Sequence, residues 1–172
     1  MGVSVRDCRH SADDRRWIQD VYGEYLESLS DLNTGFFPVI DNDDPQKDGI
    51  FASWFANERS HPLIIANGAD RVGFALVTRP QMPVEGEWQP DFRMAEFFIR
   101  KGCRRNGYGR DAASLIFDRF AGEWMIVAYQ RNSGSVGFWR QVLTAYCRGA
   151  LTERVRNGEV QHRFRSRHKT AF

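Results

Sequence analysis

The chain has 172 residues, of which 42% are hydrophobic and 13% aromatic, and its formal net charge at pH 7 is only +2. This length is enough for one well-packed domain over residues 1–172, and the composition favours neither a disordered chain nor a membrane protein. All but three of the 24 cationic side chains are arginines with no polybasic block, so we expect neither nucleic acid nor a membrane as partner.

The N-terminus lacks the apolar core of a signal peptide, and the chain is expected to be cytoplasmic. Its three cysteines, Cys8, Cys103 and Cys147, are widely spaced and form no C-x-x-C pattern. The four histidines also lack the spacing of metal ligands, so no metal is expected.

The chain begins with a predicted strand and a predicted helix. Val3 and Val5 alternate with polar residues, as in a short strand. Ser11 followed three residues later by Asp14 resembles a capping box. The apolar residues that follow, up to Leu29, repeat at helical spacing and predict an amphipathic helix.

The remaining elements follow from turn and capping signals. In chain order they are a helix opened by Asp44-Pro45, strands over 63–66, 72–77 and 92–99, a helix over 110–120, a strand over 124–129, a helix capped by Asn132 or Ser133, and a hairpin turning at 156–159. The order βααβββαβαββ predicts an α/β (α+β) fold with a mixed, largely antiparallel sheet and helices on both faces.

The turn between the strand over 92–99 and the following helix has the composition of a phosphate site. Gly107 and Gly109 can adopt backbone angles closed to other residues, so that successive amides point into one concavity at the helix N-terminus. Arg104, Arg105 and Arg110 surround the same turn, and the helix end adds partial positive charge. These residues predict a diphosphate cradle.

The run Arg104-Arg105-Asn106-Gly107-Tyr108-Gly109 is similar to the Arg/Gln-x-x-Gly-x-Gly/Ala loop of the GCN5-related N-acetyltransferases. Ile99 lies five residues ahead, where that family has the strand residue whose backbone meets the pantetheine arm of acetyl-coenzyme A. The run from Asn132 to Phe138-Trp139 resembles the second signature, an Asn followed by a small residue and an aromatic pair.

The resemblance implies a sheet of about seven strands flanked by about four helices. It also implies acetyl-coenzyme A as co-substrate and a small-molecule or peptide amine as acceptor. A homodimer formed through edge strands is compatible with such a fold. The coenzyme-binding residues that it implies are Phe98, Ile99, Arg104, Arg105, Asn106, Gly107, Tyr108, Gly109, Arg110, Asn132 and Phe138.

Acetylation of an amine requires a base, because a free alkylammonium with a pKa near ~10.4 is almost wholly protonated at pH 7. Glu96 is the candidate, since it interrupts an apolar strand three residues before Ile99 and burial would raise its pKa. Alternatively, Glu96 pairs with an arginine such as Arg93 or faces solvent.

The proton donor to the leaving thiolate is less well marked. In the family it is often a tyrosine on the helix after the Asn signature, but the matching position here is Trp139. Tyr146 and Tyr129 are the substitutes, and core packing of their rings is the alternative. A thiolate can also leave unassisted.

Other interpretations of the same residues stay open. Gly107 to Ala112 matches the G-x-G-x-x-A of dinucleotide binders, but the strand is too far away and a ribose-binding acid is missing. Asn132 can simply cap its helix, and Phe138 can belong to the core. The absence of a tyrosine at Trp139 also suits a non-catalytic acyl-coenzyme A binding or regulatory module.

Overall fold

A computed structural model describes residues 2–30, 46–80, 86, 88–148 and 150–167. The elements, in order, are β1 (Val3–Asp7), α1 (Ala12–Ser30), α2 (Gln46–Ala56), β2 (Ser60–Asn67), β3 (Asp70–Thr78), β4 (Phe92–Ile99), a 3-10 turn (Lys101–Cys103), α3 (Tyr108–Arg119), β5 (Glu123–Tyr129), α4 (Ser133–Cys147), β6 (Leu151–Arg156) and β7 (Glu159–Arg165). The predicted order of strands and α-helices is confirmed.

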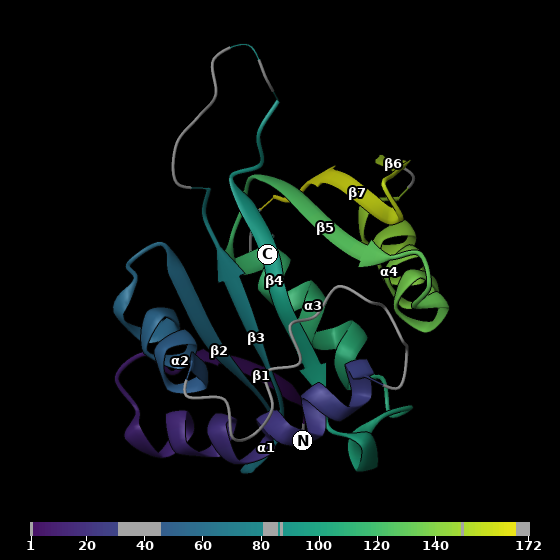
Figure 1. Cartoon of the computed structure of the whole chain (residues 1–172). Coiled ribbons are helices and arrows are strands. Elements are labelled where there is room, and N and C mark those ends of the chain that lie inside the picture. The colour runs from purple at the N-terminus through teal and green to yellow at the C-terminus, as the bar shows by residue number, and fades with distance from the viewer. Residues whose placement is uncertain (1, 31–45, 81–85, 87, 149, 168–172) are drawn as a thin grey trace.

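The strands form one sheet in the order β1-β2-β3-β4-β5-β7-β6 (Figure 1). Every neighbouring pair is antiparallel except β4 and β5, which are parallel. The prediction of a mixed, largely antiparallel sheet is therefore confirmed. Within the described residues, no helix has both the length and the apolarity needed to span a bilayer.

Helices cover both faces of this sheet. α1 and α2 lie on the near face in Figure 1 and α3 on the far face. The near core joins the two helices to β2, β3 and β4 through residues such as Ile18, Phe51 and Phe74, each at most 1% exposed. The far core joins α3 and α4 to the sheet and includes Phe117, Trp124 and Leu143, all fully buried. β4 therefore runs between two packed layers.

Most predicted boundaries agree with the structure to within a few residues. The β6–β7 hairpin turns at Asn157 and Gly158, whose φ angles of 53° and 79° are those of the predicted two-residue turn. Tyr146 lies within the last turn of α4. The predicted cap Asp44-Pro45 falls outside the described residues.

The start of α1 is only half a capping box. Ser11 Oγ accepts a hydrogen bond from the Asp14 amide at 3.2 Å, as predicted. The Asp14 carboxylate, however, is 2% exposed and binds Arg6 and Arg71. Burial raises the pKa of Asp14, but the hydrogen bonds from the two arginines outweigh burial and hold it below its ordinary value. The carboxylate thus ties α1 to β1 and β3.

Replacing Asp14 by asparagine is expected to lower the free energy of unfolding at pH 7, because it removes the charge that binds the two arginines. Water screens these partly exposed arginines, so the loss should be only about 1–2 kcal/mol. Because the pKa of Asp14 is depressed in the folded state, its contribution to stability is fully present above about pH 4, the ordinary carboxyl pKa. This contribution is lost as the pH falls further. Urea denaturation across pH checks it, with Asp13→Asn in the same turn as control. Equal losses in the two variants would assign the effect to the helix dipole.

Candidate active site

β4 and β5 are paired only where they begin. The registered pairs are Phe92 with Trp124 and Arg93 with Met125. β4 nevertheless stays paired to β3 as far as Ile99, and β5 to β7 as far as Tyr129, while the two arrows run apart in Figure 1. Residues 94–99 therefore present an open edge of β4 in the middle of the sheet, to which an extended ligand can add.

A bulge in β4 accompanies this separation. Leu76 of β3 is opposite Glu96, and the next residue, Val77, is opposite Met94, so Ala95 has no partner. Such an extra residue bends its strand and increases the local twist. It also resets the alternation of faces. Met94 packs in the far core, whereas Glu96 turns toward α1 on the near face.

The loop between β4 and α3 is built to expose amides. Arg105 and Gly107 have positive φ angles of 67° and 80°, and α3 begins directly after Gly107. The first helical bond is donated by Asp111 to the Gly107 carbonyl. Within the described chain, the amides of residues 105–110 donate no hydrogen bond to protein, so they are available to an anion at the helix N-terminus.

The two glycines of this loop have different roles, which corrects the sequence prediction. Gly107 has the left-handed conformation that was expected, but Gly109 does not. A side chain on Gly109 would instead meet the Phe138 ring at 3.2 Å and Ile99 Cγ1 at 3.6 Å. Gly109 therefore lets the first turn of α3 approach β4 and α4.

Side chains of the loop hold its shape. Arg104 Nε donates to the Ile99 carbonyl at 2.9 Å. Asn106 Nδ2 donates to the carbonyls of Cys103 and Arg104, both at 3.2 Å. The Tyr108 hydroxyl accepts a hydrogen bond from Asn67 at 3.0 Å. These contacts hold the predicted loop residues Arg104, Asn106 and Tyr108 in one local structure.

The charged flanks of the loop face solvent. Arg105 and Arg110 are exposed, and Arg110 contacts only its neighbour Asp111, at 3.1 Å, among the described ion pairs. An exposed ion pair of this kind is weak, so either guanidinium can turn to an approaching phosphate.

Three further predicted residues lie on different sides of β4. Phe98 is 2% exposed, with its ring in the near core, so only its backbone belongs to the open edge. Phe138 is partly buried and stacks on Phe97 with 5.8 Å between ring centroids. Asn132 caps α4, its side-chain oxygen accepting from the Ser135 amide at 2.9 Å. Phe138 thus brings α4 up to β4, and Asn132 fixes the start of that helix.

Glu96 is the carboxyl of this region whose pKa departs clearly upward from its ordinary value. Its Oε2 accepts a hydrogen bond from the Tyr25 hydroxyl of α1. Burial raises the pKa of Glu96 to about 7, and the Tyr25 hydrogen bond opposes the rise. No ion pair joins Glu96 to Arg93 or to any other described cation. A carboxyl with this pKa can accept a proton near neutral pH.

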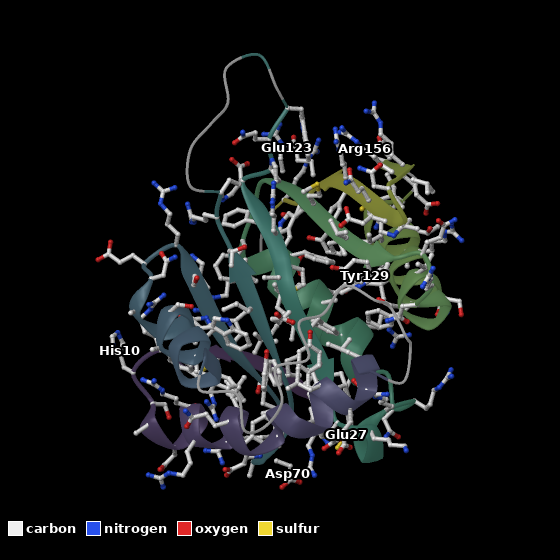
Figure 2. The ribbon with its side chains drawn as sticks, in the orientation of Figure 1. His10, Glu27, Asp70, Glu123, Tyr129 and Arg156 are labelled. Atoms are coloured by element: carbon white, nitrogen blue, oxygen red, sulfur yellow. The ribbon has the colours of Figure 1, made fainter. Side chains whose placement is uncertain are left out.

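Tyrosines surround this carboxyl. Tyr22 and Tyr25 come from α1, and Tyr129 lies at the end of β5 (Figure 2). Burial raises the pKa of Tyr129, and the charges of Glu159 and Glu96 raise it further. Burial likewise raises the pKa of Tyr22, with a smaller contribution from Glu96. All three phenols therefore stay protonated near neutral pH.

Tyr146 has different surroundings from Glu96. Its hydroxyl donates to Asp118 of α3 at 2.8 Å, and its ring packs edge-on against Phe117 at 5.1 Å. These contacts belong to the α3–α4 layer, on the opposite face of the sheet from α1. Burial raises the pKa of Tyr146, and the Asp118 hydrogen bond adds to this.

Sequence reasoning missed Tyr25 as a site residue. The helical spacing of α1 predicts that Tyr25 faces the core, and it is indeed 8% exposed. A buried tyrosine hydroxyl needs a hydrogen-bond partner, and that requirement was the available signal. The sequence did not indicate which element supplies the partner.

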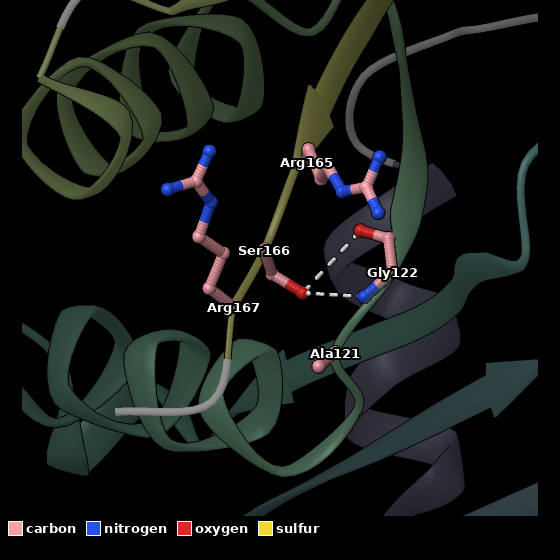
Figure 3. Close-up of a pocket in the computed structure, with 5 residues that line it drawn as sticks. All are labelled: Ala121, Gly122, Arg165, Ser166 and Arg167. Atoms are coloured by element: carbon pink, nitrogen blue, oxygen red, sulfur yellow. Dashed lines mark hydrogen bonds between the residues drawn. The ribbon is translucent and has the colours of Figure 1, made fainter. Parts of the chain in front are cut away.

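A hollow of about 390 Å³ lies elsewhere, between the end of α3 and the end of β7 (Figure 3). Ala121, Gly122 and residues 165–167 line it. The Ser166 hydroxyl is already engaged by Gly122, Trp124 and Phe120. This hydroxyl therefore joins β7 to the end of α3. Neither this hollow nor any other part of the described chain contains a group of three or more metal-ligating side chains.

The fold is shared with solved structures described as acetyltransferases. An acetyltransferase from Thermus thermophilus is 16% identical, with a TM-score of 0.65 over 95% of this chain and 96% of that one. A GNAT-family acetyltransferase from Streptococcus agalactiae is 12% identical, with a TM-score of 0.66 over 98% of both chains. The PaiA N-acetyltransferase from Thermoplasma acidophilum, in complex with coenzyme A, is 9% identical, with a TM-score of 0.58 over 96% and 99%.

The sequence profile of the acetyltransferase (GNAT) family matches residues 26–143. The chain belongs to this family, and the resemblance seen in the loop and Asn signatures is confirmed. A search among curated proteins finds no significant match. Family membership supports acetyl transfer as the general activity.

Proposed function

We propose that this protein transfers an acetyl group from acetyl-coenzyme A to a primary amine of a small molecule or peptide. The observation that carries the proposal is Glu96, a carboxyl with a pKa raised to about 7 beside the open edge of β4. A base of this strength suits the removal of a proton from an ammonium group.

The chain's own groups fit the coenzyme. The amides of residues 105–110 suit the diphosphate, and Arg104, Arg105 and Arg110 flank them. The open edge of β4 near Ile99 suits the amide-bearing pantetheine arm, which would pair there as an added strand. Asn132 and Phe138 stand beside that path on α4.

The ammonium nitrogen loses two protons as it becomes an amide, and the thiolate gains one, so one proton is released to solvent. Glu96 accepts a proton from the ammonium, directly or through water, and the free amine attacks the thioester carbonyl. The new C–N bond forms as the C–S bond breaks, the thiolate leaves with the bonding electron pair, and the nitrogen then loses its second proton to water. We assign the proton donor for that thiolate to Tyr129, because Tyr129 lies at the end of β5 within electrostatic reach of Glu96, whereas Tyr146 packs in the α3–α4 layer.

Release of free thiol from acetyl-coenzyme A, measured with a panel of amines, tests the proposal. Thiol release that depends on a primary amine and yields the N-acetylated product supports it. Coenzyme binding without turnover on any amine would instead favour the non-catalytic binding module. Matched alcohols in the panel separate N-acetylation from O-acetylation.

The assignment of Tyr129 leads to a paired prediction. Tyr129→Phe is expected to lower kcat about 10-fold or more, because the thiolate loses its proton donor. Tyr146→Phe is expected to leave kcat within about twofold while lowering the free energy of unfolding by about 1 kcal/mol, the usual net value of a hydrogen bond. Steady-state kinetics and urea denaturation of both variants check this. The reverse pattern would move the role to Tyr146.

A further inference from the structure

The hydrogen bond between Tyr25 and Glu96 joins α1 to β4 at the site proposed above. The Tyr25 hydroxyl donates to Glu96 Oε2, and no described residue donates a hydrogen bond to Oε1. Glu96 therefore has one oxygen fixed by the protein and one left for another partner.

The Tyr25 ring is held from three sides. Phe74 of β3 packs against it edge-on at 5.5 Å between ring centroids, and Phe98 of β4 lies at 5.4 Å. Tyr22, one turn earlier on α1, lies at 5.5 Å. Tyr25 itself is 8% exposed. A ring packed in this way holds its hydroxyl in one place, because a rotamer change would disturb the core.

No cation offsets the charge of Glu96 in the described structure. The titratable groups that face it are Tyr22 and Tyr25 of α1 and Tyr129 of β5, with Glu159 of β7 behind Tyr129. The neighbouring strand β3 presents the apolar Leu76 opposite Glu96. The Tyr25 hydroxyl is thus the described donor that favours the charged carboxylate.

We propose that Tyr25 is a positioning residue for the acetyl transfer inferred above: it holds Glu96 Oε2, favours the charged form of the carboxylate and leaves Oε1 to the amine. This inference rests on the proposed function. Tyr25 need not touch the substrate, since it acts through Glu96.

Tyr25→Phe keeps the ring and removes the donor. Because the lost hydrogen bond favoured the carboxylate, the pKa of Glu96 rises further, and the acidic limb of the kcat/KM profile moves to higher pH by about one unit. At pH 7 kcat falls about 3- to 10-fold, and KM for acetyl-coenzyme A stays unchanged. Tyr22→Phe is the matched control, since Tyr22 lies on the same helix and makes no hydrogen bond to Glu96.

A readout without turnover separates the two proposals. Carboxyl titration by NMR on protein labelled at glutamate side chains reports the Glu96 pKa directly, with Glu96→Gln supplying the assignment. A higher pKa in Tyr25→Phe but not in Tyr22→Phe supports the inference. An unchanged pKa, or equal shifts in both variants, overturns it. A fully active Glu96→Gln enzyme would overturn the base role of Glu96 instead, and the titration would still decide whether Tyr25 controls this carboxyl.

Discussion

Replacing Glu96 by glutamine is expected to lower kcat/KM about 10²- to 10⁴-fold, the usual contribution of a general base. Glutamine has nearly the same size but cannot accept the proton of the ammonium group. In the unmodified enzyme, kcat/KM should rise with pH with a midpoint near 7, because the carboxylate is the active form and burial raises the Glu96 pKa to about 7. Rate measurements between pH 5.5 and 8.5 check both statements.

The stability of the same variant supplies the control. A carboxyl with a raised pKa in the folded state favours folding at low pH, and this contribution is lost as the pH rises from about 4.3 through the folded value near 7. Glu96→Gln removes that dependence, so it should become more stable relative to the unmodified protein as the pH increases. A stable variant that keeps its full rate would contradict the base role.

Gly107→Val is expected to weaken coenzyme A binding about 100-fold or more. Gly107 has a φ angle of 80°, and a β-branched residue strongly disfavours that conformation. The loop must then relax and turn its amides away from the diphosphate. Loss of two hydrogen bonds to a charged group at about 1.5 kcal/mol each corresponds to this factor. Isothermal titration calorimetry with coenzyme A measures it.

The neighbouring Gly102→Val is the control for that experiment. A Cβ on Gly102 would meet nothing within 4 Å, and its φ angle is not in the left-handed region, so coenzyme binding should change by less than about threefold. Space is not the obstacle at Gly107 either, where a Cβ would lie 3.5 Å from the Arg110 guanidinium. Equal affinity of the two variants would show that the loop amides do not hold the diphosphate.

The sequence predicts the fold well because its local signals agree with one another. The Asn157-Gly158 turn, the Asn132 cap and the glycine loop before α3 each determine one boundary. The amphipathic helices then determine which faces are buried. These signals are short in range, and the sequence carries them without reference to distant residues.

The site was less accessible, because it depends on contacts between distant elements. Tyr25 and Glu96 are 71 residues apart, and the helical pattern of α1 indicates only that Tyr25 is buried. The role of Gly109 depends on the Phe138 ring, which another helix supplies. Strict alternation of side chains along β4 also misplaces Glu96. Phe92 and Met94 pack in the far core, so alternation alone predicts that Glu96 faces the far side of the sheet as well.

The unpaired Ala95 gives β4 one residue more than its neighbour β3 at this point. The bend that parts β4 from β5 is thus encoded by the number of residues in the strand, and side chains along it can change while the bend persists. Shortening β4 by this one residue would keep Glu96 on its face but straighten the strand. β4 and β5 would then pair beyond Arg93, and the open edge proposed for acetyl-coenzyme A would close. This would happen although every residue proposed to act in the reaction remained.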